Sequence, residues 1–147
     1  MKTAGTLPEA RHEVRLSCDP ASPSRARSEV RRLLGHEHPV VDDAALAASE
    51  LVTNAIRHSG CQADDVIGFT LVVTDAFVRV EVRDPGASLT GPRLRSEPDE
   101  EDGRGLLIVQ AIAAAWGVGR HDDRPGRTVW CALRIAWPTS GPPDAAP

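Results

Sequence analysis

The sequence has few aromatic side chains and no excess of positive charge. Phe, Trp and Tyr together make up 3% of the 147 residues, and Tyr is absent. Proteins that bind single-stranded nucleic acid stack the bases on aromatic side chains, so this function is disfavoured. The formal net charge of -4, with no basic patch along the chain, also argues against a DNA-binding surface. We therefore expect no direct contact with nucleic acid.

Metal-binding cysteine pairs and membrane spans are also missing. The three cysteines, Cys18, Cys61 and Cys131, are widely spaced and form no CxxC pair or Cys/His ligand pattern. Their spacing supports neither a zinc site nor a disulfide framework, and we expect reduced thiols. No run is long enough to cross a membrane, and the N-terminus lacks the apolar segment of a signal peptide. These absences predict a cytoplasmic protein without membrane contact.

The composition that remains is that of one globular domain. Hydrophobic residues are 41% and charged residues 26%, and a chain of this length can bury a substantial core without crosslinks. Residues 1–11 show no periodicity and are expected to form a flexible tail. Residues 138–147 are rich in Pro, Gly, Ser and Ala, which predicts disorder. The domain is therefore expected over residues 12–137.

Periodic apolar residues predict the elements of this domain. The order is strand, helix, helix, strand, strand, long loop, helix, strand, strand. Hairpins dominate the strand connections, which predicts an α+β two-layer sandwich with a mixed, mostly antiparallel sheet. About three helices are expected to cover one face of that sheet. The expected helices are 21–35, a segment capped by Asp42 or Asp43 that ends at Ser59, and a segment from Gly105 to about Trp116; the expected strands include 12–18, 66–74, 77–84 and 127–137.

Three short motifs carry polar residues that could do chemistry. Glu50, Asn54 and His58 follow one another at four-residue spacing, so they form a polar line on a helix whose opposite stripe is apolar. Asp84-Pro85-Gly86 ends a hydrophobic strand, and Gly103-Arg104-Gly105-Leu106 opens a helix after an irregular loop. Closely spaced glycines at a helix start let backbone N–H groups approach phosphate oxygens. Taken singly, each motif also fits a solvated helix face, a turn or a loop.

The order of the three motifs resembles that of a known family. Residues 49–58 resemble the N-box of the GHKL ATPases, and the Asp84 and Gly103 motifs are similar to their G1 and G2 boxes. The run 126–130 also resembles the last strand of the anti-sigma-factor serine/threonine kinases in this family. The resemblance covers about residues 12–137 and implies the Bergerat ATP-binding fold, with ATP and Mg²⁺ as ligands.

The resemblance also implies roles for individual residues. Asn54 would ligate Mg²⁺ through its amide oxygen, and Glu50 would act as general base or orient a water. Asp84 would accept a hydrogen bond from the adenine amino group, beside Gly86, while the Thr128 hydroxyl would support the adenine side. The implied nucleotide-binding set is Asn54, Arg57, His58, Asp84, Gly86, Gly103, Arg104, Gly105, Leu106 and Thr128.

Two functions remain open at this stage. The first is a serine/threonine protein kinase that sequesters a sigma factor and phosphorylates an anti-anti-sigma antagonist, with homodimers as the resemblance implies. The second is an ATP-dependent binding module without phosphotransfer, because five carboxylates between residues 97 and 102 would repel a triphosphate. An isolated histidine-kinase ATPase half is a weaker third interpretation. The Arg-rich segment 24–34 is a candidate partner surface, or simply a helix that covers the sheet.

Overall fold

The computed structural model describes residues 9–85, 100–120 and 126–136, and its elements follow the expected order. β1 begins two residues inside the expected N-terminal tail, and the expected C-terminal tail lies outside the described residues. Within the described ranges, no helix is long and apolar enough to cross a membrane. The elements are β1 (Ala10–Ser17), α1 (Ser22–Leu34), α2 (Val41–Ser59), β2 (Val66–Val73), β3 (Phe77–Arg83), α3 (Glu100–Ile112), β4 (Ala115–Arg120) and β5 (Arg127–Arg134).

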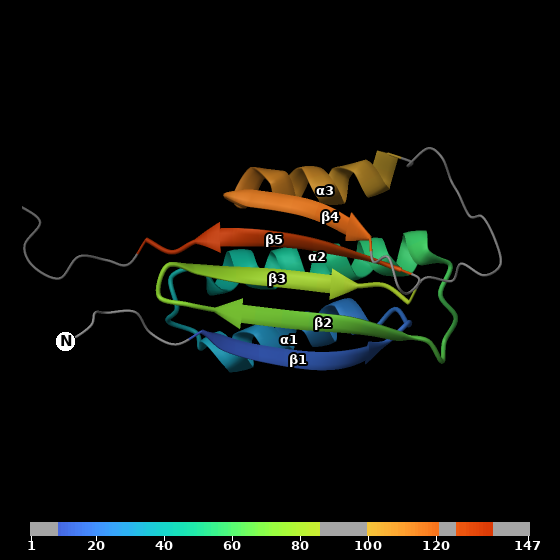
Figure 1. Ribbon diagram of the computed structural model, residues 1–147, viewed down its shortest axis with the longest axis horizontal. Helices are drawn as coiled ribbons and strands as arrows, with labels where there is room; N and C mark the ends of the chain where they lie inside the picture. The colour runs from blue at the N-terminus through green and yellow to red at the C-terminus, as the bar shows by residue number, and fades with distance from the viewer. Residues whose placement is uncertain (1–8, 86–99, 121–125, 137–147) are drawn as a thin grey trace, which may run out of the picture.

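The five strands form one sheet in the order β1-β2-β3-β5-β4. Every neighbouring pair is antiparallel, so the sheet expected to be mixed is wholly antiparallel. Figure 1 shows α1 and α2 behind the strands, and α3 packs against α2. The two-layer α+β architecture expected from the sequence is confirmed.

Alternation along the strands and small residues on α2 build the core between the two layers. On β3, Val78, Val80 and Val82 are buried, as the period of two in a strand with one covered face requires. On α2 the residues facing the sheet are mostly alanines, so the helix axis can approach the strands closely, and larger side chains such as Phe69 and Leu51 fill the remaining space.

The Arg-rich helix α1 covers the sheet beside α2. Ala26 and Val30 are completely buried, whereas Arg31 and Arg32 form ion pairs at the surface. Arg31 Nη1 lies 2.9 Å from Asp42 Oδ1 on α2. Asp42 and Asp43 do not cap α2, because the helix already begins at Val41 and its N-cap is Val40. Both carboxylates lie in the first turn instead, where they stabilise the helix dipole.

Two expected boundaries around α3 are wrong. The helix begins at Glu100, so Gly103, Arg104 and Gly105 lie inside it. It ends at Ile112, and Trp116 belongs to β4, paired with Cys131. In this segment the backbone ladder with β5 outweighs the helical pattern. Gly117 leaves room for the Trp130 side chain, because a Cβ on Gly117 would lie 2.9 Å from atoms of that ring.

The expectation of three reduced cysteines is also wrong. Cys18, after β1, and Cys61, after α2, form a disulfide with a Cα–Cα distance of 6.2 Å. They are 43 positions apart in sequence, and only the packing of α2 against the sheet brings them together. Cys131 is free and buried. Burial raises the pKa of the Cys131 thiol to about 11, which keeps it protonated and unreactive.

Candidate functional site

The polar line on α2 lies along the edge of the buried stripe. Glu50, Asn54 and His58 are half-buried, while Arg57 is exposed. The buried stripe, with Leu51 and Val52, packs under the sheet and fixes the helix rotation. The helix ends at Ser59, and the following Gly60 is its C-cap, with a left-handed φ of 70° that suits glycine. The packing of the apolar stripe therefore determines where the polar line points.

Asp84 follows β3 and, among the residues that the structure describes, is the one charged residue that is buried, with 6% of its surface exposed. Its backbone N–H donates to the Arg127 carbonyl at 3.0 Å, which extends the β3–β5 ladder by one step. The Arg127 N–H donates to Asp84 Oδ1 at 3.4 Å, and Arg127 Nε lies 3.4 Å from Oδ2. Both carboxylate oxygens are thus tied to one residue of the neighbouring strand.

Arg127 was not among the residues expected from the sequence. The expectation selected Thr128, but the ladder pairs Thr128 with Arg83, one position before Asp84. Since side chains alternate along a strand, Thr128 lies on the open face with Arg83, whereas Asp84 continues the buried series of Val80 and Val82. The only sequence signal for Arg127 is its position, directly after Gly126 at the start of the last strand.

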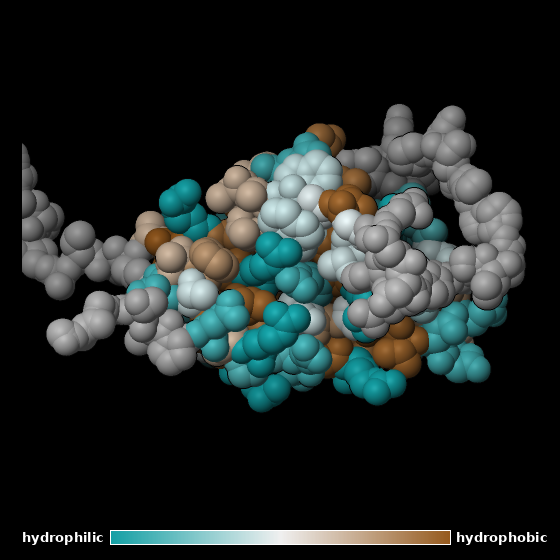
Figure 2. All heavy atoms as spheres, in the orientation of Figure 1, coloured by the Kyte–Doolittle hydropathy of each residue, from teal (hydrophilic) through white to brown (hydrophobic). Residues whose placement is uncertain are grey.

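A shallow groove of about 660 Å³ lies on the open face of the sheet near Asp84. Figure 2 shows this face, with hydrophilic side chains across the strands. Arg11, Arg15 and Arg83 line the groove together with Glu13 and Glu81, so cations and carboxylates alternate. Glu50, Asn54 and His58 lie on α2, behind the sheet, and are not part of the groove. Two other expected site residues, Asp84 and Thr128, do line the groove, so the groove reaches the expected site at the end of β3.

The expected site residues gather at one end of the molecule, called the site end below. The end of α2, the end of β3, the start of β5 and the start of α3 all lie there (Figure 1). Asn54 and His58 on α2 and Asp84 after β3 are thus placed toward the same end by two elements. Leu106 on α3 is half-buried and packs against the core. Gly86 lies outside the described residues, and Gly103, Arg104 and Gly105 are described only as helical backbone.

The donor chemistry at this end fits Mg²⁺ held with a nucleotide. Within the described residues, no group of three or more His, Cys, Asp or Glu side chains could hold a metal ion. Mg²⁺ characteristically keeps few protein ligands and takes the others from substrate phosphates and water. The half-buried Asn54 offers an amide oxygen, and Glu50 one turn earlier offers a carboxylate. The Asn54 amide oxygen is a hard ligand that fits a cation arriving with its phosphates.

The chain resembles known proteins over most of its length. Residues 16–133 match the histidine kinase-like ATPase domain. The anti-sigma F factor of Clostridium acetobutylicum is 32% identical over 79 residues, 49% of this chain and 55% of that protein. An uncharacterized Streptomyces coelicolor protein is 35% identical over 86 residues, 56% of this chain and 77% of that protein.

The solved structures give the same result for the fold. The crystal structure of the RsbU and RsbW domains of Rv1364c from Mycobacterium tuberculosis matches with a TM-score of 0.62 and 20% identity. The match covers 86% of this chain and 32% of that one. The chain thus spans about half the length of the anti-sigma F factor and about a third of the crystallised chain.

Proposed function

The chain belongs to the histidine kinase-like ATPase domain family, and we propose that it binds ATP with Mg²⁺ at the site end of the sheet. The observation that carries this proposal is the buried carboxylate of Asp84. It is fixed at the end of β3, on the side of the sheet that α2 covers. A buried, ionisable acceptor beside a helix with half-buried polar residues is characteristic of a ligand site.

Each residue contributes a distinct interaction in this proposal. The Asp84 carboxylate accepts a hydrogen bond from the exocyclic amine of adenine. The Asn54 amide oxygen and the nucleotide phosphates hold Mg²⁺, which neutralises phosphate charge. Glu50, one helical turn before Asn54, orients and deprotonates the hydroxyl that receives the γ-phosphate. Gly103 and Gly105, in the first turns of α3, offer backbone close to the phosphates.

We further propose a regulatory role in the cytoplasm, as an anti-sigma protein that phosphorylates an antagonist. The support is the similarity to a protein named anti-sigma F factor, within a shared ATPase fold. Its partners would be a sigma factor and an anti-anti-sigma protein, bound by a homodimer. The second candidate, a binding module without phosphotransfer, is favoured by the five carboxylates between residues 97 and 102.

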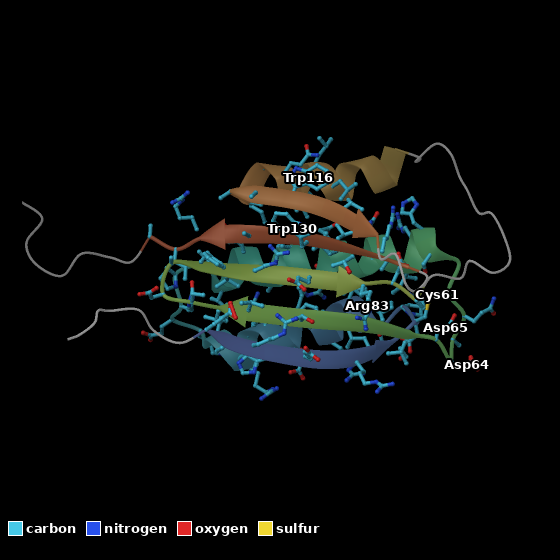
Figure 3. All side chains as sticks on the ribbon, in the orientation of Figure 1. Cys61, Asp64, Asp65, Arg83, Trp116 and Trp130 are labelled. Carbon is cyan, nitrogen blue, oxygen red and sulfur yellow. A yellow bond between two sulfur atoms is a disulfide. The ribbon has the colours of Figure 1, made fainter. Side chains whose placement is uncertain are left out.

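Replacement of Asp84 tests nucleotide binding. Asp84→Asn keeps the size of the side chain but turns an acceptor into a mixed donor and acceptor, so ATP affinity should fall at least about tenfold, or about 1.4 kcal/mol. Titration calorimetry with Mg²⁺ and ATP measures the change. Asp64→Asn is the matched control, since Asp64 is an exposed carboxylate on the loop after α2 (Figure 3). If the wild-type protein bound no ATP, the proposed function would be wrong.

Replacement of Glu50 separates the kinase from the binding module. Glu50→Gln retains hydrogen bonding but removes the base, so ATP binding should survive while phosphotransfer to the antagonist falls about 10²–10⁴-fold. The assay follows labelled phosphate from ATP to the partner protein. A wild-type protein that binds ATP and partner but transfers no phosphate would establish the binding module. Equal transfer by both proteins would mean that another residue is the base.

A further inference from the structure

Arg127 touches the Asp84 carboxylate through both its backbone and its side chain. From these contacts we infer that Arg127 is a positioning residue, which orients Asp84 toward the exocyclic amine of the base and thereby sets the preference for adenine. The inference rests on the proposed nucleotide site and adds Arg127, to which the resemblance of the run 126–130 gave no role. It assigns base selectivity to a pair of residues on β3 and β5.

The argument begins with the burial of the carboxylate. An ionised side chain with 6% exposure is costly unless charged or polar groups compensate it. Here the Arg127 N–H reaches Oδ1 and the guanidinium Nε reaches Oδ2, both at 3.4 Å. A carboxylate has about four acceptor positions, and these two contacts take one on each oxygen. Two contacts on different oxygens also stop rotation of the carboxylate plane.

The geometry of the strands explains why Arg127 is available for this role. Asp84 and Arg127 follow directly on the last paired positions of the ladder, Arg83 with Thr128, so their backbones remain hydrogen-bonded. The Arg127 side chain is 29% exposed and therefore spans the distance between the buried carboxylate and the surface. Arg79, five positions before Asp84 on β3, instead pairs with Glu81 at 2.6 Å and stacks on Trp130. Its role on the open face is structural.

Binding selectivity distinguishes positioning from a merely structural role. A site that donates or accepts one specific hydrogen bond discriminates against an analogue that lacks the partner group. Purine riboside triphosphate lacks only the exocyclic amine of ATP, so the ratio of the two affinities reports the Asp84 contact. A fold defect alone would weaken both nucleotides and leave the ratio unchanged.

The experiment compares two arginines of β5 in the full-length protein. Arg127→Met removes the guanidinium but keeps the backbone N–H and the side-chain length; Arg134→Met makes the same change at the exposed far end of the strand. Calorimetry with Mg²⁺ and each triphosphate gives the affinities, and thermal unfolding verifies the fold. Arg127→Gln is the second variant, should Arg127→Met fail to fold.

The wild type and Arg134→Met should prefer ATP about tenfold over purine riboside triphosphate. Arg127→Met or Arg127→Gln should lower this preference to about threefold or less, through weaker ATP binding with the analogue unaffected. A wild-type ratio in the folded Arg127 variants, or an equal loss for both nucleotides, would overturn the inference and leave the proposed site intact. Absence of ATP binding by the wild type would contradict the proposed function itself.

Discussion

At one end of the sheet, Thr74 closes the turn between β2 and β3 with its own hydroxyl, which accepts hydrogen bonds from the N–H groups of Ala76 and Phe77 at 3.0 Å each. We call this the hairpin end. At the opposite, site end, the ties join segments that are far apart in sequence. The Cys18–Cys61 disulfide spans 43 positions, and Arg127 reaches Asp84 across the same separation.

The difference separates local from long-range stabilisation. The hairpin end is built from neighbours in the chain, so little entropy is lost when its turn forms. The site end requires the whole sheet and α2 to be in place before its ties can form. Disruption at the hairpin end should therefore cost little and leave the site unaffected, whereas loss of a tie at the site end should cost more and reach the candidate binding residues.

The largest effect is expected from removal of the disulfide. Cys18→Ser frees a loop of 43 positions in the unfolded chain, which should lower the free energy of unfolding by about 4 kcal/mol without reductant. The measurement is urea unfolding with and without dithiothreitol. Added reductant should destabilise the wild type by a similar amount and leave Cys18→Ser unchanged.

Cys131→Ser is the control for this experiment. Its thiol is buried and free, so the substitution should lower stability somewhat but preserve the response to reductant. If the wild-type unfolding curve did not change on reduction, the disulfide would contribute no stability, and the contrast between the two ends would lose its main support.

A smaller effect is expected at the hairpin end. Thr74→Val keeps the shape of the side chain but removes the acceptor for two backbone N–H groups, which should cost about 1 kcal/mol in the free energy of unfolding. Thr70→Val on the same strand is the matched control, at a half-buried position of the groove. Calorimetry with ATP should show unchanged affinity for both variants; weaker binding by Thr74→Val would mean that the ends are coupled.

The smallest effect concerns His38, in the connection between α1 and α2 at the hairpin end. Burial lowers the pKa of His38 below its ordinary value of 6.5, and its Nδ1 accepts a hydrogen bond from the Val40 N–H at 3.2 Å. Protonation of Nδ1 would remove that acceptor. Because the unfolded chain binds the proton more readily, the stabilisation is present above pH 6.5 and is lost as the pH falls through the folded pKa.

Urea unfolding at pH 7.5 and pH 5.0 measures this dependence. The wild type should lose stability between these pH values, by less than the Thr74→Val effect, and His38→Gln should lose less. His36→Gln replaces the exposed histidine two positions earlier and should behave as the wild type does. Equal pH dependence for His38→Gln and the wild type would assign the effect to other groups.

The sequence by itself determined the order of the elements and most of the fold. Alternation of apolar residues in 66–73 and 77–83 is a local property, and so is the helical period of α2, with Leu51 and Val52 on its buried stripe. The three motifs were sufficient to identify the family, because their order and spacing along the chain are specific. The roles of Glu50 and Asn54 remain predictions, which the Glu50→Gln assay addresses.

Only the tertiary structure decided which distant residues meet. The pairing of β3 with β5 places Arg127, rather than Thr128, beside Asp84. The packing of α2 on the sheet joins Cys18 to Cys61, which their spacing gave no reason to expect. Residue periodicity records which face of an element is buried, but it does not record register between strands. A shift of one residue in register reverses every side chain, so these contacts depend on the assembled sheet.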